Sequence, residues 1–193
     1  MLDNLQKYDV ILASNSPRRR ELLTNLGITF SPFVIFGIDE SYPSDLKGEE
    51  VALFVAEKKA AAYKEHIRHN RLIITADTIV STAEGVLGKP QDEQAAWDML
   101  RLISGREHSV TTAFTLNTTE CHISQAVTTV VKFAPLTDEM IEYYIHRFLP
   151  FDKAGAYGIQ EWIGFAAVES INGSYSNVVG LPTQQLYEAL SKL

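Results

Sequence analysis

Residues 8–27, YDVILASNSPRRRELLTNLG, pass from a short apolar run into a polar turn and then an arginine- and leucine-rich stretch. The run over 8–13 is β-favouring and predicts a strand. The pattern after it predicts a helix over 17–26, with Ser16 as its N-cap, proline at its first position and Gly27 after its end. A strand, a turn and a helix are therefore expected in direct succession.

A second segment repeats the pattern of an apolar run that ends in polar residues. The alanine- and lysine-rich stretch 48–68 predicts a helix, and the β-favouring run 72–76 predicts the next strand. That strand ends at Asp77 and Thr78, as the first one ends at Ser14. Two strands are thus expected to present polar side chains at their ends.

The rest of the chain carries further helical and strand-like patterns, without a linker, repeat or low-complexity tract. They predict helices over 91–103 and 137–147, alternating strands over 110–116 and 123–133, a strand over 165–171, and a last helix aligning Leu186, Leu190 and Leu193. The two alternating strands are expected to form a long antiparallel ribbon.

The composition is that of a globular protein with an acidic balance. Of 193 residues, 46% are hydrophobic, which allows a substantial core, and the length suits one domain or two intimately packed lobes. The formal net charge of −7 argues against a general nucleic-acid coat. Because the field of the whole protein repels an anionic substrate, the lysines and arginines that meet one must be gathered locally.

Neither secretion nor membrane insertion is indicated. The amino terminus lacks a charged leader before a long apolar stretch, and no segment approaches the roughly 20 apolar residues of a membrane span. The single cysteine, Cys121, has no internal disulfide partner and no neighbour at metal-ligand spacing, so we interpret it as a packed thiol. We expect a cytosolic protein without a membrane partner.

The segment SNSPRR, residues 14–19, places hydroxyl groups and two arginines where a strand becomes a helix. Backbone amides, the positive end of the helix and the guanidinium groups can converge there on phosphate, which suits a triphosphate tail. In the alternative interpretation, Ser16 only caps the helix while the arginines at 18–20 face solvent. Arginines at a helix start oppose its dipole, however, which a purely structural role does not favour.

Asp77 and Glu40 are the candidate acidic residues. Asp77 follows the apolar run LIITA, at a strand end, where its carboxylate could bind a divalent cation or accept a proton from water. Glu40, in GIDES, is a candidate second ligand, since magnesium prefers one or two carboxylates. The alternatives are an ordinary turn or helix cap for Asp77 and a surface position for Glu40.

Two lysines and one glutamine complete the set of candidates. Lys59 and Lys89 could each neutralise charge that grows on phosphates during transfer, or could simply be solvated. Gln160 closes a glycine-containing loop, and its amide could pair with the edge of a base, or the loop could simply lead into a strand. The marks of P-loop ATPases, zinc proteases, serine hydrolases and paired-cysteine zinc sites are missing from the sequence.

Eight ordered fragments resemble the Maf family of nucleotide pyrophosphatases. They are LASNSPRRRELL, GIDES, EKKA, TADTIV, LGKP, SGREHSV, DKAGAYGIQ and NGSYSNVVGLP, and together they extend over nearly the whole chain. The resemblance implies an α/β fold related to inosine triphosphate pyrophosphatases, in which helices flank an elongated mixed sheet. It also implies a single Maf-like domain, 1–193, whose two lobes enclose a central cleft.

The resemblance assigns roles position by position. It makes Asp77 the proposed catalytic carboxylate, and it places around phosphates and metal the residues Ser14, Arg18, Arg19, Glu40, Lys59 and Lys89. Arg18, Thr78 and Gln160 resemble the branch of the family that acts on dTTP and UTP. Asn15 departs from many relatives, which carry glycine there.

These observations lead to one main hypothesis. Magnesium or manganese, held by Asp77 and Glu40, is expected to assist water in cleaving a nucleoside triphosphate into the monophosphate and pyrophosphate. Relatives suggest a homodimer. The alternatives are a non-catalytic regulator of cell division, with which the family is also associated, and a nucleic-acid binder that uses the arginine cluster, which the acidic balance disfavours.

Overall fold

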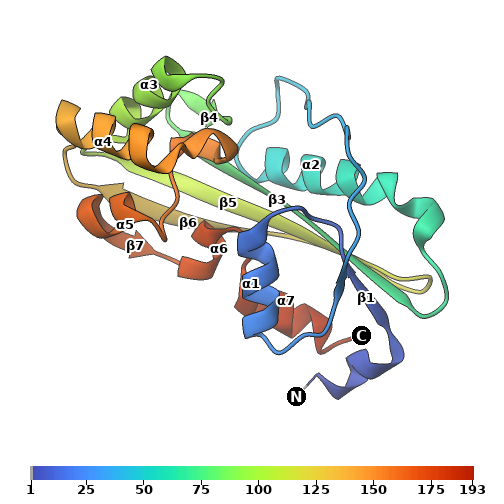
Figure 1. The fold of residues 1–193 in the computed structure, drawn as a ribbon. Helices are drawn as coiled ribbons and strands as arrows, with labels where there is room; N and C mark the ends of the chain where they lie inside the picture. Colours follow the sequence, from blue (N-terminus) through green and yellow to red (C-terminus); the bar gives the residue numbers. More distant parts are fainter. Residues whose placement is uncertain (1) are drawn as a thin grey trace. The chain divides into compact units, whose positions relative to one another are not determined.

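The computed structural model describes residues 2–193. Their strands form a mixed seven-stranded sheet (Figure 1). The strands follow the order β2 (Ser31–Pro32), β1 (Asp9–Leu12), β3 (Arg71–Thr82), β5 (Glu107–Asn117), β6 (His122–Phe133) and β7 (Val168–Asn172), and β4 (Gly85–Leu87) pairs with β3 off this path. β1 runs parallel to β2 and β3, whereas β4 is antiparallel to β3 and β7 to β6.

Helices flank this sheet, which confirms the predicted α/β class. The α-helices are α1 (Pro17–Asn25), α2 (Glu49–Ala62), α3 (Glu93–Ile103), α4 (Asp138–Phe148), α5 (Trp162–Ala167), α6 (Tyr175–Val179) and α7 (Thr183–Leu190). Short 3-10 helices are η1 (Asp3–Lys7), η2 (Lys64–His66), η3 (Pro150–Asp152) and η4 (Ala154–Ala156). Within residues 2–193, no helix combines the length and apolar character needed to cross a bilayer.

The chain divides into two compact units. The first unit contains the residues up to Asp77, Thr112–Val127 and Gly180–Leu193, and the second contains Thr78–Thr111 and Thr128–Val179. Strands β3, β5 and β6 therefore contribute residues to both units. The expected cleft between two lobes stays a prediction.

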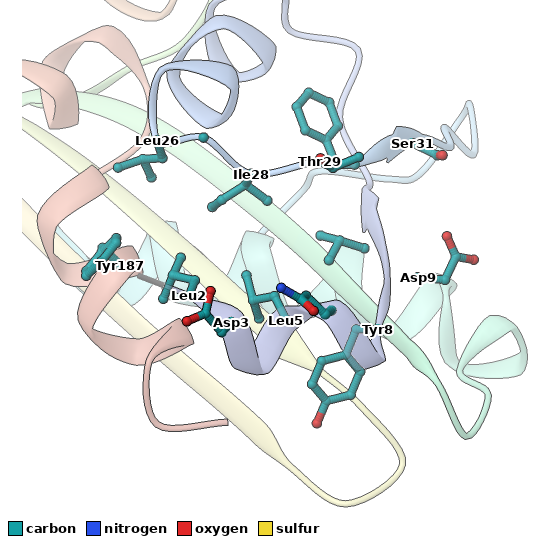
Figure 2. Close-up of a pocket in the computed structure, with 14 residues that line it drawn as sticks. Leu2, Asp3, Leu5, Tyr8, Asp9, Leu26, Ile28, Thr29, Ser31 and Tyr187 are labelled. Atoms are coloured by element: carbon teal, nitrogen blue, oxygen red, sulfur yellow. The ribbon is translucent and has the colours of Figure 1, made fainter.

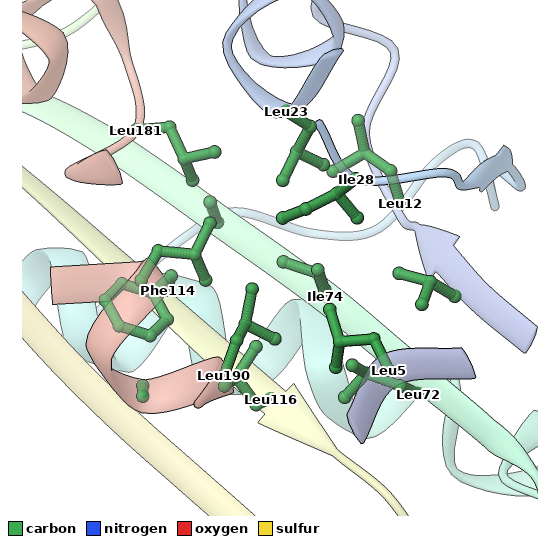
Figure 3. Packing of buried hydrophobic residues seen from close by; sticks show 14 residues of the cluster. Leu5, Leu12, Leu23, Ile28, Leu72, Ile74, Phe114, Leu116, Leu181 and Leu190 are labelled. Atoms are coloured by element: carbon green, nitrogen blue, oxygen red, sulfur yellow. The ribbon is translucent and has the colours of Figure 1, made fainter. Parts of the chain in front are cut away.

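In the first unit, alternate residues of β1 and β3 belong to two different apolar clusters. Leu12 and Ile74 pack with Leu23 of α1 and with residues of α7 in one cluster (Figure 3). Ile73 belongs to the other, together with Tyr63 at the end of α2. Successive side chains of a strand point to opposite faces. Helices α1 and α7 therefore cover one face of these strands, and the end of α2 covers the other.

The core of the second unit contains an aromatic group and a pair of helices. The rings of His108, Phe133 and Tyr157 meet edge to face, with centroids 5.0–5.3 Å apart. Helix α3 buries Leu100 and helix α4 buries Tyr144, and the two helices are in contact. Period-3.6 spacing of apolar residues explains both helices.

Several elements confirm the sequence predictions. Helix α1 begins at Pro17, and the Ser16 side chain accepts a hydrogen bond from the Arg19 amide at 3.4 Å, as an N-cap does. Helices α3 and α4 lie within or close to the predicted ranges, and Asp92 and Thr137 cap them. Strands β5 and β6 are sheet neighbours joined by residues 118–121, so they form the predicted ribbon.

Other boundaries were predicted wrongly. Residues 165–167, predicted as the first part of the strand over 165–171, instead belong to helix α5, because Ile163 and Ala167, four residues apart, face the core while Phe165 is exposed. Helix α2 ends at Ala62, because Tyr63 turns into the apolar cluster. Helix α7 ends at Leu190, and Leu193 packs beyond it against the same cluster.

Candidate active site

Asp77 lies within β3, not at its end as predicted, because the strand continues to Thr82. Its neighbour β1 stops earlier: the parallel pairing ends at Leu12 opposite Ile74. Two residues before Asp77, the Thr75 hydroxyl donates to the Ala56 carbonyl of α2 at 3.0 Å. Side chains two apart on a strand share a face, so Asp77 also faces α2, beyond the end of β1.

Lys59 of α2 meets two carboxylates at once. Its Nζ lies 2.7 Å from Asp77 Oδ1 and 2.9 Å from Glu40 Oε1. The side chains of Lys59 and Asp77 are 15% and 12% exposed, whereas that of Glu40 is 48% exposed. Lys59 lies one helical turn after Ala56, the residue that accepts the Thr75 bond, so α2 positions its ammonium over Asp77.

Glu40 belongs to residues 33–48, which have no helix or strand but are anchored to α2. The Tyr63 hydroxyl accepts from the Ile35 amide at 2.8 Å and donates to the Phe33 carbonyl. Lys58 Nζ lies 2.7 Å from Asp39, and the hydrogen bond from Lys58 lowers the pKa of Asp39 well below its usual range. Adjacent lysines of α2 thus bind adjacent carboxylates of this segment.

Ser14 and Arg19 approach Asp77 from the start of α1, whereas Lys59 approaches it from α2. Arg19 Nη1 donates to the Ala76 carbonyl at 2.8 Å and to Ser14 Oγ at 3.3 Å, and Arg19 Nε donates to the Gly180 carbonyl at 2.8 Å. Burial lowers the pKa of Arg19, while the nearby negative charge of Asp77 acts in the opposite direction. The first unit therefore brings Arg19 and Ser14 close to the Asp77 backbone.

The other two arginines of α1 differ in their surroundings. Arg18 is half-buried, and its positive charge contributes to lowering the pKa of Arg19, so the two guanidinium groups lie within electrostatic range. Arg20 instead bonds Asn15 Oδ1 at 2.9 Å near the surface. Asn15 thus anchors Arg20.

Three predicted site residues belong to the second unit. Thr78 follows Asp77 directly in β3 and is half-buried, Lys89 is exposed after β4, and Gln160 is half-buried before α5. The structure thus brings together Ser14, Arg19, Glu40, Lys59 and Asp77. That Thr78, Lys89 and Gln160 join them stays a prediction.

Sequence reasoning missed the residues that hold the Gln160 loop. The Tyr144 hydroxyl accepts from the Gly158 amide at 2.9 Å and hydrogen-bonds the Glu161 carboxylate. Lys153, only 8% exposed, binds the same carboxylate with Nζ 3.1 Å from Glu161 Oε1. Burial raises the pKa of Tyr144, so the hydroxyl stays protonated and able to donate. The lysine in the fragment DKAGAYGIQ was the one sequence feature that could have indicated this network.

A separate pocket of about 580 Å³ opens in the first unit (Figure 2). It lies at the amino end of β1, beside Asp9, with Leu5 of η1 and Tyr187 of α7 in its wall. Ser14 and Asp77 lie beyond the other end of β1. The residues that line the pocket include no lysine or arginine, so it does not suit a triphosphate.

Nearly the whole chain matches one family of known proteins. The family model described as Maf-like protein matches residues 9–193. The chain belongs to the Maf family. A Maf relative from Phocaeicola vulgatus named dTTP/UTP pyrophosphatase is 53% identical over 193 residues, 100% of both chains. One of the same name from Flavobacterium johnsoniae is 42% identical over 99% of this chain and 98% of its own.

A solved structure shares the fold of this Maf protein. It is a HAM1 protein from Coxiella burnetii, which matches with a TM-score of 0.52 and 13% sequence identity, over 96% of this chain and 100% of that one. At this identity the match shows the fold alone. The match confirms the predicted fold class, an α/β fold in which helices flank a mixed sheet.

Proposed function

We propose that this Maf protein hydrolyses dTTP and UTP to the nucleoside monophosphate and pyrophosphate. The observation that carries the proposal is the convergence of Asp77 and Glu40 on the Lys59 ammonium, in a chain whose full-length relatives bear the name dTTP/UTP pyrophosphatase. Hydrolysis of a phosphoanhydride needs a proton acceptor and positive charge near the phosphates. Both are present around Asp77.

Asp77 is the proton acceptor of the proposed reaction. A water molecule placed against the α-phosphorus gives a proton to the Asp77 carboxylate while its oxygen forms the new bond to phosphorus. The bond from the α-phosphorus to the oxygen that bridges the β-phosphorus breaks, and pyrophosphate leaves with that electron pair. Lys59, 2.7 Å from Asp77, fixes the carboxylate and stabilises the negative charge of the transition state.

The phosphates are proposed to lie at the start of α1. Ser14 Oγ already accepts from the Ser16 amide at 3.2 Å and from Arg19, so its own hydrogen is directed away from both donors. The helix start and the Arg18 guanidinium add positive charge there. Lys89 of the second unit is proposed to join them on the phosphates.

A divalent cation, magnesium or manganese, is proposed to be held by Asp77 and Glu40. The fit rests on the ammonium of Lys59: a single cationic group already lies within 2.9 Å of an oxygen from each carboxylate. No cluster of three or more histidine, cysteine or acidic ligands occurs in residues 2–193, and magnesium sites commonly use one or two carboxylates, with phosphate oxygens and water as the remaining ligands. When bound, the cation would neutralise charge on the phosphates.

The pyrimidine base is proposed to be selected by Gln160 and Thr78. A glutamine amide offers both a donor and an acceptor, as the edge of uracil or thymine does. A base with the wrong pattern leaves a buried polar group unpaired and binds less well. Equal turnover of UTP, CTP and purine triphosphates would contradict this assignment.

The function is tested by product analysis with dTTP or UTP and magnesium. The protein should release pyrophosphate and the monophosphate, and Asp77→Asn should remain folded and lose turnover by at least about 100-fold. Asp39→Asn is the matched control, because Asp39 lies beside Glu40 but pairs with Lys58. Full activity of Asp77→Asn would remove Asp77 from the mechanism, and no pyrophosphate from the unaltered protein would favour the regulatory alternative.

The cation is tested separately by chelation. Treatment with EDTA should abolish turnover, and added magnesium or manganese should restore it. Glu40→Gln should need a higher metal concentration for half of its maximal rate. Unchanged turnover in EDTA would exclude the cation from the reaction.

A further inference from the structure

Arg19 is bonded to three separate segments of the first unit. Its Nε donates to the Gly180 carbonyl before α7, and its Nη1 donates to the Ala76 carbonyl of β3 and to Ser14 Oγ after β1. These bonds use three of the five donors of a guanidinium group. From these contacts we infer that Arg19 is a positioning residue that holds the backbone in front of Asp77, rather than a ligand of the substrate phosphates.

The edge of β3 shows why such a residue is needed. The Ala13 amide donates to the Ile74 carbonyl at 2.9 Å, which is the last bond that the β1 segment gives to β3. Carbonyls two residues apart on a strand point to the same edge, so the Ala76 carbonyl also points toward β1. With β1 ended at Leu12, Arg19 Nη1 takes the place of a strand amide and satisfies this acceptor.

The bond acts directly on the candidate catalytic residue. The Ala76 carbonyl and the Asp77 amide belong to one planar peptide group, so fixing one atom of it orients the Cα of Asp77. Lys59 holds the Asp77 carboxylate from the α2 side, and Arg19 holds its backbone from the α1 side. The two contacts together define the position from which Asp77 receives a proton.

A lysine in place of Arg19 cannot make the same set of hydrogen bonds. The guanidinium group is planar and directs donors along several fixed directions, whereas an ammonium is a single point on a flexible stem. In Arg19→Lys, the shorter ammonium would reach one of the two carbonyls and leave the other buried acceptor without its partner. The inference rests on the proposed function, since it assumes that Asp77 takes part in the reaction.

The test compares Arg19→Lys with Arg20→Lys, a matched change on the next residue, whose bond to Asn15 lies near the surface. Three quantities are measured well below the unfolding temperature: kcat with UTP, the dissociation constant for UTP carrying a methylene group between the α- and β-phosphorus, and amide hydrogen exchange over residues 74–79. In Arg19→Lys, kcat should fall about 10- to 100-fold while the dissociation constant changes less than about twofold. The amide exchange rate over residues 74–79 should rise measurably, by up to about tenfold, which is the effect of losing one hydrogen bond.

Two results would overturn the inference. If Arg19→Lys raised the dissociation constant of the analogue by tenfold or more, with or without loss of kcat, Arg19 would be a phosphate ligand instead. Unchanged kcat together with unchanged exchange would remove the positioning role. Because exchange does not depend on turnover, failure of this inference is distinguishable from failure of the proposed function, which appears as no pyrophosphate from the unaltered protein. Arg20→Lys should behave as the unaltered protein in all three measurements.

Discussion

Among the residues that the fold brings together around Asp77, Lys59 contacts two carboxylates. One ammonium compensates two carboxylates, and two of the three side chains are largely shielded from water. Removing one member of such a group leaves the others as uncompensated charge, which costs more than the group itself contributes to stability. Lys59 is therefore expected to matter for both folding and turnover.

Lys59→Met should lower kcat/KM by at least about 100-fold and destabilise the fold by about 1–3 kcal/mol. The neighbouring Lys58→Met is the control, because Lys58 pairs with an exposed carboxylate, Asp39, and should change both quantities little. Steady-state kinetics with UTP and urea unfolding measure the two effects. Equal losses in the two variants would show that the convergence on Asp77 has no special role.

His108 should make the stability of the protein depend on pH. It is 3% exposed, and burial lowers the pKa of its imidazole from 6.5 to about 4. Between these values the unfolded chain binds a proton that the folded chain does not. The free energy of unfolding is therefore full above pH 6.5 and falls as the pH drops toward 4, by about 3 kcal/mol in all.

Urea unfolding at intervals from pH 4 to 7 measures this dependence. His108→Phe should flatten it, and the variant should be less stable than the unaltered protein near pH 7, because the Tyr157 hydroxyl loses its 2.7 Å partner. His146→Gln is the control, since His146 is exposed, and should keep the slope of the unaltered protein. A slope that survives in His108→Phe would assign the pH dependence to other groups.

At the scale of elements, the loop that carries Gln160 is fixed from α4. Tyr144 binds Gly158 and Glu161, so a single hydroxyl closes the turn on both sides of Gln160, and Lys153 restrains the same carboxylate. A turn held in this way keeps a glutamine amide in one orientation. Orientation decides which base edge an amide can match.

Tyr144→Phe should therefore relax base selection. The ratio of kcat/KM for UTP to that for CTP should fall about 5- to 50-fold, because the turn loses a hydrogen bond at both ends. Tyr143→Phe, one residue earlier on α4 and 49% exposed, is the control. The ratio should stay unchanged in the control, and an unchanged ratio in Tyr144→Phe would separate this network from specificity.

The elements differ in how far the sequence alone predicts them. Helix α1 was predictable because Ser16, Pro17 and Gly27 mark both of its ends with local chemistry. Helix α5 was not, because FAAVESI suits a strand locally, and burial of Ile163 against the core decides between the two. Strand β3 was predicted too short, since Asp77 and Thr78 have turn chemistry that pairing in the sheet overrides.

The candidate site shows the same limit. The residue types of Asp77, Glu40 and Lys59 indicated their chemistry, but 18 residues separate Lys59 from Asp77, and only the fold makes them neighbours. The bonds of Arg19 had no sequence pattern at all, because its acceptors at Ala76 and Gly180 are backbone carbonyls, which every residue carries.

At the scale of the whole molecule, the two units share their strands. β3 passes from the first unit to the second between Asp77 and Thr78, and β5 and β6 pass between them as well. A strand that loses its order in one unit loses pairing in the other, so the two units should unfold together. The chain provides a selective probe, because both of its tryptophans, Trp97 and Trp162, belong to the second unit.

Ile74→Val, in the core of the first unit, should therefore be detected by tryptophans of the second. Ile74 is 0% exposed, and loss of one buried methylene should lower the free energy of unfolding by about 1 kcal/mol. The urea midpoint from tryptophan fluorescence should shift by the same amount as that from far-UV circular dichroism. Ile103→Val, equally buried in the second unit, should give the same agreement. A fluorescence midpoint that stays fixed in Ile74→Val, while the dichroism curve divides into two steps, would show that the shared strands do not couple the two units.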